Sequence, residues 1–191
     1  EGIQFEKGAW ADALAAAKAQ DKLIFIDAYT TWCGPCKMMA RDVFTDADVG
    51  AFFNENFVNV KMDMEAGEGL QLAREYKVRA YPTLLFIDGD GMLVHRGTGY
   101  HEAGPFIELG QTALNPEMTL SAMQERFAAG DRDPAFLFEY TFAAYEAYDG
   151  SHKPVVEAYL ETQENWNTMD NMMFIFTFVE DPDSPLFDYL V

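Results

Sequence analysis

The spacing of apolar residues changes repeatedly along the first 115 residues, which indicates alternating helices and strands. Trp10, Leu14 and Ala17 recur at helical spacing within an alanine-rich stretch, and this pattern predicts a helix over residues 10–20. Residues 23–28 form an almost continuous apolar run that contains two isoleucines. Such a run predicts a strand that is buried on both faces, as central strands are.

Turn and capping residues divide the chain after this strand. Pro35 is favoured in a first helical turn, so a helix of about two to three turns is expected from this residue. Thr45 and Asp48 predict a capped helix that ends near residue 53, because their side chains can bind its first amide groups. Asp88-Gly89-Asp90-Gly91 predicts a hairpin turn. Strands are expected at residues 57–62, 83–87 and 92–95, and helices at residues 68–76 and 102–114. This order predicts an α/β fold with a mixed sheet flanked by helices.

The pattern changes at Asn115-Pro116, beyond which no strand is expected. Glycine-containing and polar turns separate four amphipathic stretches, at residues 120–129, 134–148, 154–164 and 168–179. They form two helix pairs that resemble tetratricopeptide-like pairs, but two pairs are too few to stack into a solenoid. The sequence therefore predicts an α/β domain at residues 1–115 and a small helical extension at residues 116–191.

Charge limits the possible partners of the protein. The chain has 32 acidic and 13 basic residues and a formal net charge of −19. Such a surface repels phosphate backbones and anionic lipid headgroups, so nucleic acid is not an expected partner. No window contains the roughly 18 apolar residues that a membrane span needs, so no span is expected. Residue 1 is Glu rather than Met, and an N-terminal segment was therefore either removed or never included.

Cys33 and Cys36 are the two cysteines of the chain, and their spacing suits thiol–disulfide exchange. Cys33 lies at the entrance of the predicted helix, where unpaired amide groups favour a thiolate. We expect Cys33 to be the exposed nucleophile and Cys36, one turn further on, to be the shielded resolving thiol. Pro35 stiffens the turn between them. An inert disulfide clip is the alternative. The motif, however, follows a predicted buried strand and opens a helix, as a redox site should, and so short a loop would stabilise the fold less than a long-loop bridge.

The cysteines do not suggest a metal site or another cofactor. Structural zinc needs four ligands, and the three histidines do not cluster with the cysteines at ligand spacing (His95, His101 and His152). His95 and His101 lie on either side of the loop after the last predicted strand and could approach the site, although packing is the simpler interpretation. The redox-active group is expected to be the Cys33–Cys36 disulfide itself.

Residues 23–100 resemble a thioredoxin, and the resemblance extends beyond Trp32-Cys33-Gly34-Pro35-Cys36. It implies that Asp27 is a buried carboxylate that serves as general base for the resolving cysteine, with Lys61 as its charged partner. Burial at the end of an apolar strand should also raise the pKa of Asp27 toward neutrality. By the same resemblance Tyr81-Pro82-Thr83 is a cis-proline loop whose Tyr81 backbone pairs with an extended substrate. The expected substrate-binding residues are Trp32, Gly34, Pro35, Tyr81, Pro82 and Thr83.

Two departures from thioredoxins limit what the resemblance implies about the surface and the choice of partner. Tyr29 stands where thioredoxins usually have tryptophan, and residues 41–49 form an additional short segment after the active-site helix. This segment is similar to the C-terminal domain of the transmembrane thiol–disulfide interchange reductase of bacterial envelopes and to small exported thioredoxin-like proteins. The resemblance implies a periplasmic or cell-envelope location, while the cytoplasm stays open as an alternative.

The function expected from these residues is protein-disulfide reduction through a Cys33/Cys36 dithiol–disulfide cycle. Its partners would be disulfide-containing client proteins and an upstream dithiol electron donor. Two alternatives remain. The same cycle could run as a thiol oxidase or isomerase, because direction depends on reduction potential. The chain could instead be a redox-regulated binding module, in which the helical extension recruits a partner.

Overall fold

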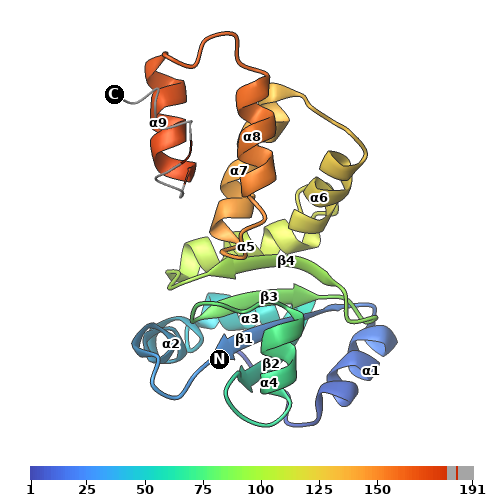
Figure 1. Ribbon diagram of the computed structural model, residues 1–191. Helices are drawn as coiled ribbons and strands as arrows, with labels where there is room; N and C mark the ends of the chain where they lie inside the picture. Colours follow the sequence, from blue (N-terminus) through green and yellow to red (C-terminus); the bar gives the residue numbers. More distant parts are fainter. Residues whose placement is uncertain (180–183, 185–191) are drawn as a thin grey trace. The chain divides into compact units, whose positions relative to one another are not determined.

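The computed structural model describes residues 1–179 and 184, and a mixed sheet lies at the centre of its first part (Figure 1). The strands are β1 (Leu23–Tyr29), β2 (Phe57–Asp63), β3 (Thr83–Ile87) and β4 (Leu93–Thr98). Their order in the sheet is β2-β1-β3-β4, with β1 parallel to β2, and β3 antiparallel to both β1 and β4. The predicted mixed sheet is confirmed, and β1 is one of its two inner strands.

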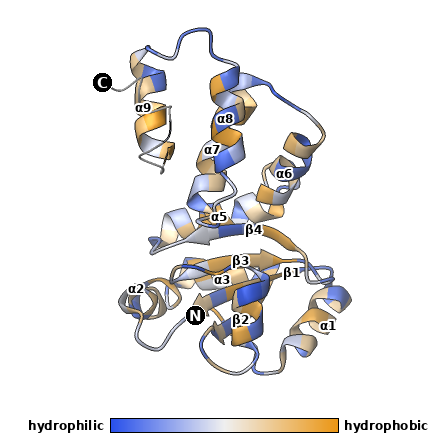
Figure 2. Ribbon diagram, viewed as in Figure 1, coloured by the Kyte–Doolittle hydropathy of each residue, from blue (hydrophilic) through white to orange (hydrophobic). Residues whose placement is uncertain are grey.

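Helices cover both faces of this sheet. They are α1 (Trp10–Gln20), α2 (Gly34–Met38), α3 (Ala47–Asn56), α4 (Gly69–Glu75) and α5 (Ala103–Leu114). Helices α1 and α4 pack on one face, and α3, α5 and the turn that follows α2 contribute to the core on the other. Figure 2 shows the apolar character of β3, every residue of which is buried. The predicted α/β arrangement is therefore present.

The alternation of side chains along β1 decides where its one carboxylate lies. Ile24, Ile26 and Ala28 belong to the core shared with α1 and α4. Phe25 points to the opposite face, into an aromatic core shared with α3 and α5. Because side chains alternate across a strand, Asp27 shares the face of Phe25. An ionisable group is thus placed at the edge of a core built mainly from phenylalanine.

Two local predictions need correction. The helix after Cys33 begins at Gly34 rather than Pro35 and continues as a π-helical turn, Met39–Val43, closed by a 2.9 Å hydrogen bond from Phe44 N to Met39 O. Helix α3 is capped by Asp46, not by Thr45 and Asp48. The Asp46 carboxylate accepts hydrogen bonds from two amides of the first turn, whereas the Thr45 hydroxyl donates to the preceding turn. Asp46 prevails because it directly precedes the helix, in the N-cap position.

The remaining helices are α6 (Leu120–Ala128), α7 (Pro134–Glu146), α8 (Lys153–Glu161) and α9 (Met169–Phe178), which confirms a C-terminal helical region. By its internal contacts the chain divides into two compact units, Glu1–Met123 and Gln124–Val191. The division predicted at Asn115-Pro116 stays a prediction, and residues 180–183 and 185–191 of the predicted extension lie outside the described residues. Across the described part of the chain, no helix is long and apolar enough to cross a membrane.

Candidate active site

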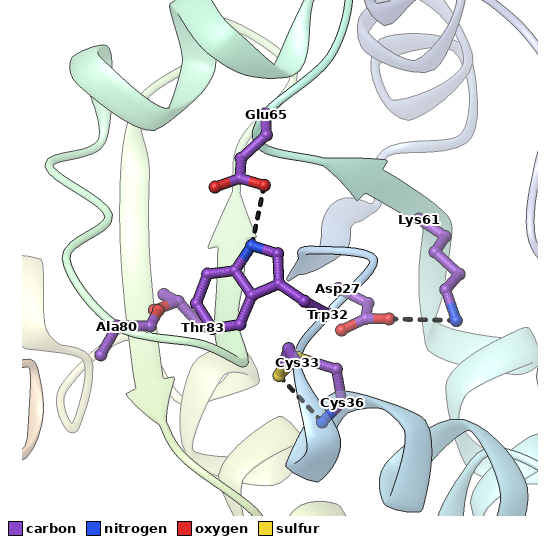
Figure 3. The surroundings of a disulfide bond; sticks show 8 residues. All are labelled: Asp27, Trp32, Cys33, Cys36, Lys61, Glu65, Ala80 and Thr83. Atoms are coloured by element: carbon purple, nitrogen blue, oxygen red, sulfur yellow. Dashed lines mark hydrogen bonds and ion pairs between the residues drawn. A yellow bond between two sulfur atoms is a disulfide. The ribbon is translucent and has the colours of Figure 1, made fainter.

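Cys33 and Cys36 form a disulfide at the N-terminus of α2, with their Cα atoms 5.4 Å apart (Figure 3). Cys33 is the N-cap residue of this helix, and its Sγ accepts a 3.1 Å hydrogen bond from the Cys36 amide. The same amide would face the sulfur after reduction, and hydrogen bonding to a thiolate lowers the pKa of a thiol. The predicted geometry of a nucleophile at a helix entrance is therefore present.

The expected difference in exposure between the two cysteines is wrong for this oxidised form. Cys33 and Cys36 are each 2 % exposed. In the disulfide the Cys33 sulfur lies against Cys36 and accepts a hydrogen bond from its amide, whereas the predicted exposure applies to the free thiol. Gly34 and Pro35 between them are exposed, and a Cβ at Gly34 would meet only open space. Access to the disulfide therefore depends on the residues around it.

Asp27 and Lys61 lie opposite each other because β1 and β2 run parallel in register. The Lys61 Nζ atom is 3.5 Å from Asp27 Oδ2. Asp27 is fully buried, while a third of the Lys61 side chain is exposed. Burial raises the pKa of Asp27 from 3.8 to about 6, although the nearby ammonium acts in the opposite direction. The site thus holds a carboxyl group able to exchange a proton near neutral pH, and its role as a base stays a prediction.

The loop before β3 contains a cis peptide bond between Tyr81 and Pro82, as the family resemblance implied. Both Pro82 and Thr83 are buried, and the Thr83 hydroxyl donates a 2.8 Å hydrogen bond to the Ala80 carbonyl. The Tyr81 ring packs edge-on against Trp32 with centroids 5.9 Å apart. This contact joins the cis-proline loop to the residue that precedes Cys33.

Glu65 is a site residue that the sequence did not reveal. Its carboxylate accepts a 2.9 Å hydrogen bond from the Trp32 indole nitrogen, and Figure 3 shows the indole pointing at it. Trp32 is 65 % exposed, so this bond and the Tyr81 contact fix a large apolar surface beside the disulfide. Glu65 follows β2 and Trp32 follows β1. Since parallel strands end at the same edge of a sheet, their closeness could have been anticipated.

The two histidines near the last strand have local roles. His95 lies in β4 and is buried, and its Nδ1 accepts a 3.2 Å hydrogen bond from the amide of Leu120, the first residue of α6. Burial lowers the pKa of His95 to about 4. His101 Nδ1 is 3.0 Å from the Gly99 carbonyl oxygen. The packing interpretation of His95 is thereby supported.

Known proteins resemble the first part of this chain. Residues 4–89 match a family model described as Thioredoxin-like. The chain is 40% identical over 93 residues to a thioredoxin of Echinococcus granulosus, a match that covers 49% of this chain and 80% of that protein. It is 30% identical over 99 residues to the thiol:disulfide interchange protein DsbD of Colwellia psychrerythraea, covering 50% of this chain but 16% of that protein. Among solved structures, a putative disulphide-isomerase from Bacteroides thetaiotaomicron shows a TM-score of 0.55 at 45% identity, covering 60% of this chain and 95% of that one.

The Cys33–Cys36 pair in this fold is suited to exchanging electrons between a dithiol and a disulfide. The chain is therefore a thiol–disulfide oxidoreductase. It belongs to the thioredoxin-like family, as its match to four-fifths of a thioredoxin at 40% identity shows. The direction in which electrons flow is a separate matter.

Proposed function

We propose that this protein reduces disulfides in client proteins. The observation that carries the proposal is the position of the disulfide: Cys33 caps α2, and Trp32 beside it contacts Tyr81 of the cis-proline loop. A client strand that pairs with the Tyr81 backbone would bring its own disulfide to Cys33. Support for the reducing direction comes from Gly34-Pro35, which resembles the dipeptide of reducing thioredoxins, and from the similarity to a thioredoxin.

The reaction divides into two exchanges. In the first, the Cys33 thiolate attacks one sulfur of the client disulfide, a Cys33–client disulfide forms, and the other client sulfur leaves as a thiolate that takes up a proton. In the second, Cys36 loses its proton to Asp27 and attacks the Cys33 sulfur. The Cys33–client bond breaks, and the second client sulfur leaves as a thiolate that takes up a proton. The client gains two electrons and two protons, and the protein ends with the Cys33–Cys36 disulfide. An upstream dithiol donor then reduces that disulfide.

The proposed location is the periplasm or cell envelope. Its support is the 30% identity to part of the thiol:disulfide interchange protein DsbD and the segment at residues 41–49 described above. Clients there would be exported proteins whose disulfides need reduction. A compartment-specific thiol-labelling experiment in the source organism would test this location, and labelling of Cys33 confined to the cytoplasm would contradict it.

Two cysteine variants test the reductase function. Cys33→Ala should abolish insulin-disulfide reduction, and Cys36→Ala should accumulate a mixed disulfide between Cys33 and insulin. Persistent turnover by Cys33→Ala would refute the assignment. Equilibration of the wild-type pair with glutathione tests direction: a potential near that of thioredoxin, about −270 mV, supports a reductant, whereas one near about −120 mV would reverse the proposal.

A second candidate function, client binding by the helical unit, is favoured by the outer face of α9. Met169, Met173 and Phe176 recur at helical spacing and are 70, 56 and 70 % exposed. The opposite face of α9 is buried through Phe174 and Phe178, so the helix is apolar on both sides. Residues 124–191 contain 14 acidic and three basic residues. Charge complementarity therefore selects a basic, amphipathic client segment as the occupant of this face.

A synthetic basic amphipathic peptide tests this second function. Met173→Ala with Phe176→Ala should weaken its binding to the full chain at least about tenfold, because the apolar contacts are lost while the charge of this face is unchanged. Met92→Ala, at an exposed methionine of the hairpin, is the matched control and should bind as wild type does. Equal affinity of all three proteins would refute the function, as would equal binding of an acidic peptide.

A further inference from the structure

The Lys61 ammonium group lies among three aromatic rings. The Nζ atom is 4.9 Å from the centre of the Tyr29 ring, 5.9 Å from that of Phe44 and 6.0 Å from that of Phe5. These distances are within the range at which the face of a ring attracts a cation. The same Nζ atom is 3.5 Å from the Asp27 carboxylate. The ammonium group is therefore attracted by one carboxylate and by the faces of three rings.

One of these rings comes from the N-terminal segment, which precedes the first helix. Residues 3, 4 and 6 of this segment each donate a backbone hydrogen bond of 2.8 Å, to the Phe44 carbonyl, the Asn54 side chain and the Asn59 carbonyl. The Phe5 ring packs edge-on against Phe44, with centroids 5.6 Å apart. Phe5 is thus held over Lys61 by bonds on both sides of it in the chain.

Two glycines allow the segment to come so close. A Cβ atom at Gly2 would collide with the Phe44 carbonyl oxygen, and a Cβ atom at Gly50 of α3 would collide with the Glu1 carbonyl oxygen. Both obstacles are backbone atoms, so neither could be avoided by a change of rotamer. The N-terminal segment therefore packs closely against α3 and the turn before it, and this packing requires glycine at both positions.

We propose that Phe5 is a positioning residue of the exchange reaction, whose ring holds the Lys61 ammonium against Asp27 for the proton transfer that accompanies resolution by Cys36. This inference rests on the proposed function, because Phe5 would act in the same reaction cycle through its contact with Lys61. Lys61 is a third exposed and its ammonium group is strongly hydrated in water. Without the Phe5 ring, the Tyr29 and Phe44 rings remain, but the flexible side chain turns toward solvent more often and the ammonium lies beside the carboxylate for less of the time.

Among the described residues, Lys61 is the charged group that shifts the pKa of Asp27. Tyr29 and Asp63 are the next residues along the same face of β1 and β2, and they pair with each other in the register of the two strands. The β3 residue opposite Asp27 is Leu84, which has no charge. Glu6 and Lys7 of the N-terminal segment are exposed. A change at Asp27 is therefore expected to follow the position of Lys61 more than that of any of these groups.

The direction of the effect follows from the two influences on Asp27. Burial raises the pKa of its carboxyl group and Lys61 lowers it. Phe5→Leu fills the same space without a ring, so burial remains while the hold on Lys61 weakens. The pKa of Asp27 should then rise by about half a pH unit, in the same direction as in Lys61→Met. Phe5→Tyr retains a ring and should behave as wild type does.

Two measurements test this inference. The first is an NMR titration of the Asp27 carboxyl group in the oxidised full chain, which needs no turnover. The second is the resolving step: reduced protein reacts with an aromatic disulfide whose thiol product is coloured, and the second release of colour reports attack by Cys36. In Phe5→Leu this second phase should slow about twofold at pH 6 and be unchanged above pH 8, because fewer Asp27 groups are ionised at the lower pH.

The control is Phe52→Leu, which removes a ring from the partly buried margin of the same aromatic core but not from Lys61. It should leave both measurements unchanged. An unshifted or lowered pKa of Asp27 in Phe5→Leu, or an equal shift in Phe52→Leu, would overturn the role of Phe5. If Cys33→Ala also retained turnover, the proposed function would fail, whereas a silent Phe5→Leu beside an inactive Cys33→Ala would refute this inference alone.

Discussion

The substitution Asp27→Asn tests how the buried carboxyl group affects the stability of the oxidised protein. Burial raises the pKa of Asp27 from 3.8 to about 6 in the fold. The folded state therefore holds this proton more tightly than the unfolded chain does, and the free energy of unfolding falls as pH rises from about 4 to 6. A difference of about 2 units between the folded and unfolded pKa values changes the free energy of unfolding by roughly 3 kcal/mol.

Asparagine keeps the shape of the side chain and does not ionise. We therefore expect the unfolding free energy of Asp27→Asn, relative to that of wild type, to increase by about 3 kcal/mol between pH 3 and pH 7 and to stay level above that. Comparing the two proteins at each pH removes the contribution of all other titrating groups. Part of the gain is offset where Lys61 loses its partner, but its side chain is exposed enough to be hydrated.

Urea unfolding of both oxidised proteins, followed by circular dichroism at each pH, gives the two free energies by linear extrapolation. Reductant is left out so that the Cys33–Cys36 disulfide stays intact. A difference between the variants that is constant within about 1 kcal/mol from pH 3 to pH 7 would refute the reasoning, because Asp27 would then have the same pKa in the folded and unfolded states.

Three further changes test other parts of the structure. Burial lowers the pKa of His95 to about 4, so the unfolding free energy should fall by roughly 3 kcal/mol as pH drops from 6.5 to 4. His95→Asn should remove this loss, and an unchanged dependence of the unfolding free energy on pH in the same urea series would contradict it. Phe53→Ala should lower the unfolding free energy by about 3–5 kcal/mol, because the buried Phe53 ring stacks on the Phe106 ring with centroids 4.2 Å apart. A loss of stability no larger than that caused by Phe52→Ala, at a more exposed ring, would count against this packing. Glu65→Ala should raise KM for a disulfide peptide about 3- to 10-fold with little change in kcat, because Trp32 loses its hydrogen bond. An unchanged KM would show that Glu65 does not contribute to substrate binding.

Elements with strong local patterns were predictable from the sequence. The helix at residues 10–20 and the strand at residues 83–87 have the expected limits. The alanine-rich helix ends at Asp21, which adopts a left-handed conformation, and the strand lies between Pro82 and the turn at Asp88. In each case the residues that end the element are its immediate neighbours, so the information is local.

The features that were missed depend on contacts between distant segments. Glu65 reaches Trp32 across 33 residues, and Phe5 approaches Lys61 only because residues 2–6 bind α3 and the turn before it. The burial of Cys33 is the one missed feature that is local: it is observed with the Cys33 sulfur bonded to Cys36, whereas the sequence prediction was made for a free thiol. The Asp27–Lys61 pair was anticipated through the family resemblance, and the structure supplies its cause in the parallel register of β1 and β2.

The π-helical turn at Met39–Val43 has a consequence for variation in this part of the chain. A turn closed from Phe44 to Met39 contains one residue more than an α-helical turn does, and one residue corresponds to a rotation of about 100° around the helix axis. Deleting Ala40 would make the helix more regular and would carry Phe44 away from the rings of Phe25 and Phe106. We expect the near-ultraviolet circular dichroism of such a deletion variant to weaken, because the irregular turn sets the direction in which the Phe44 ring points.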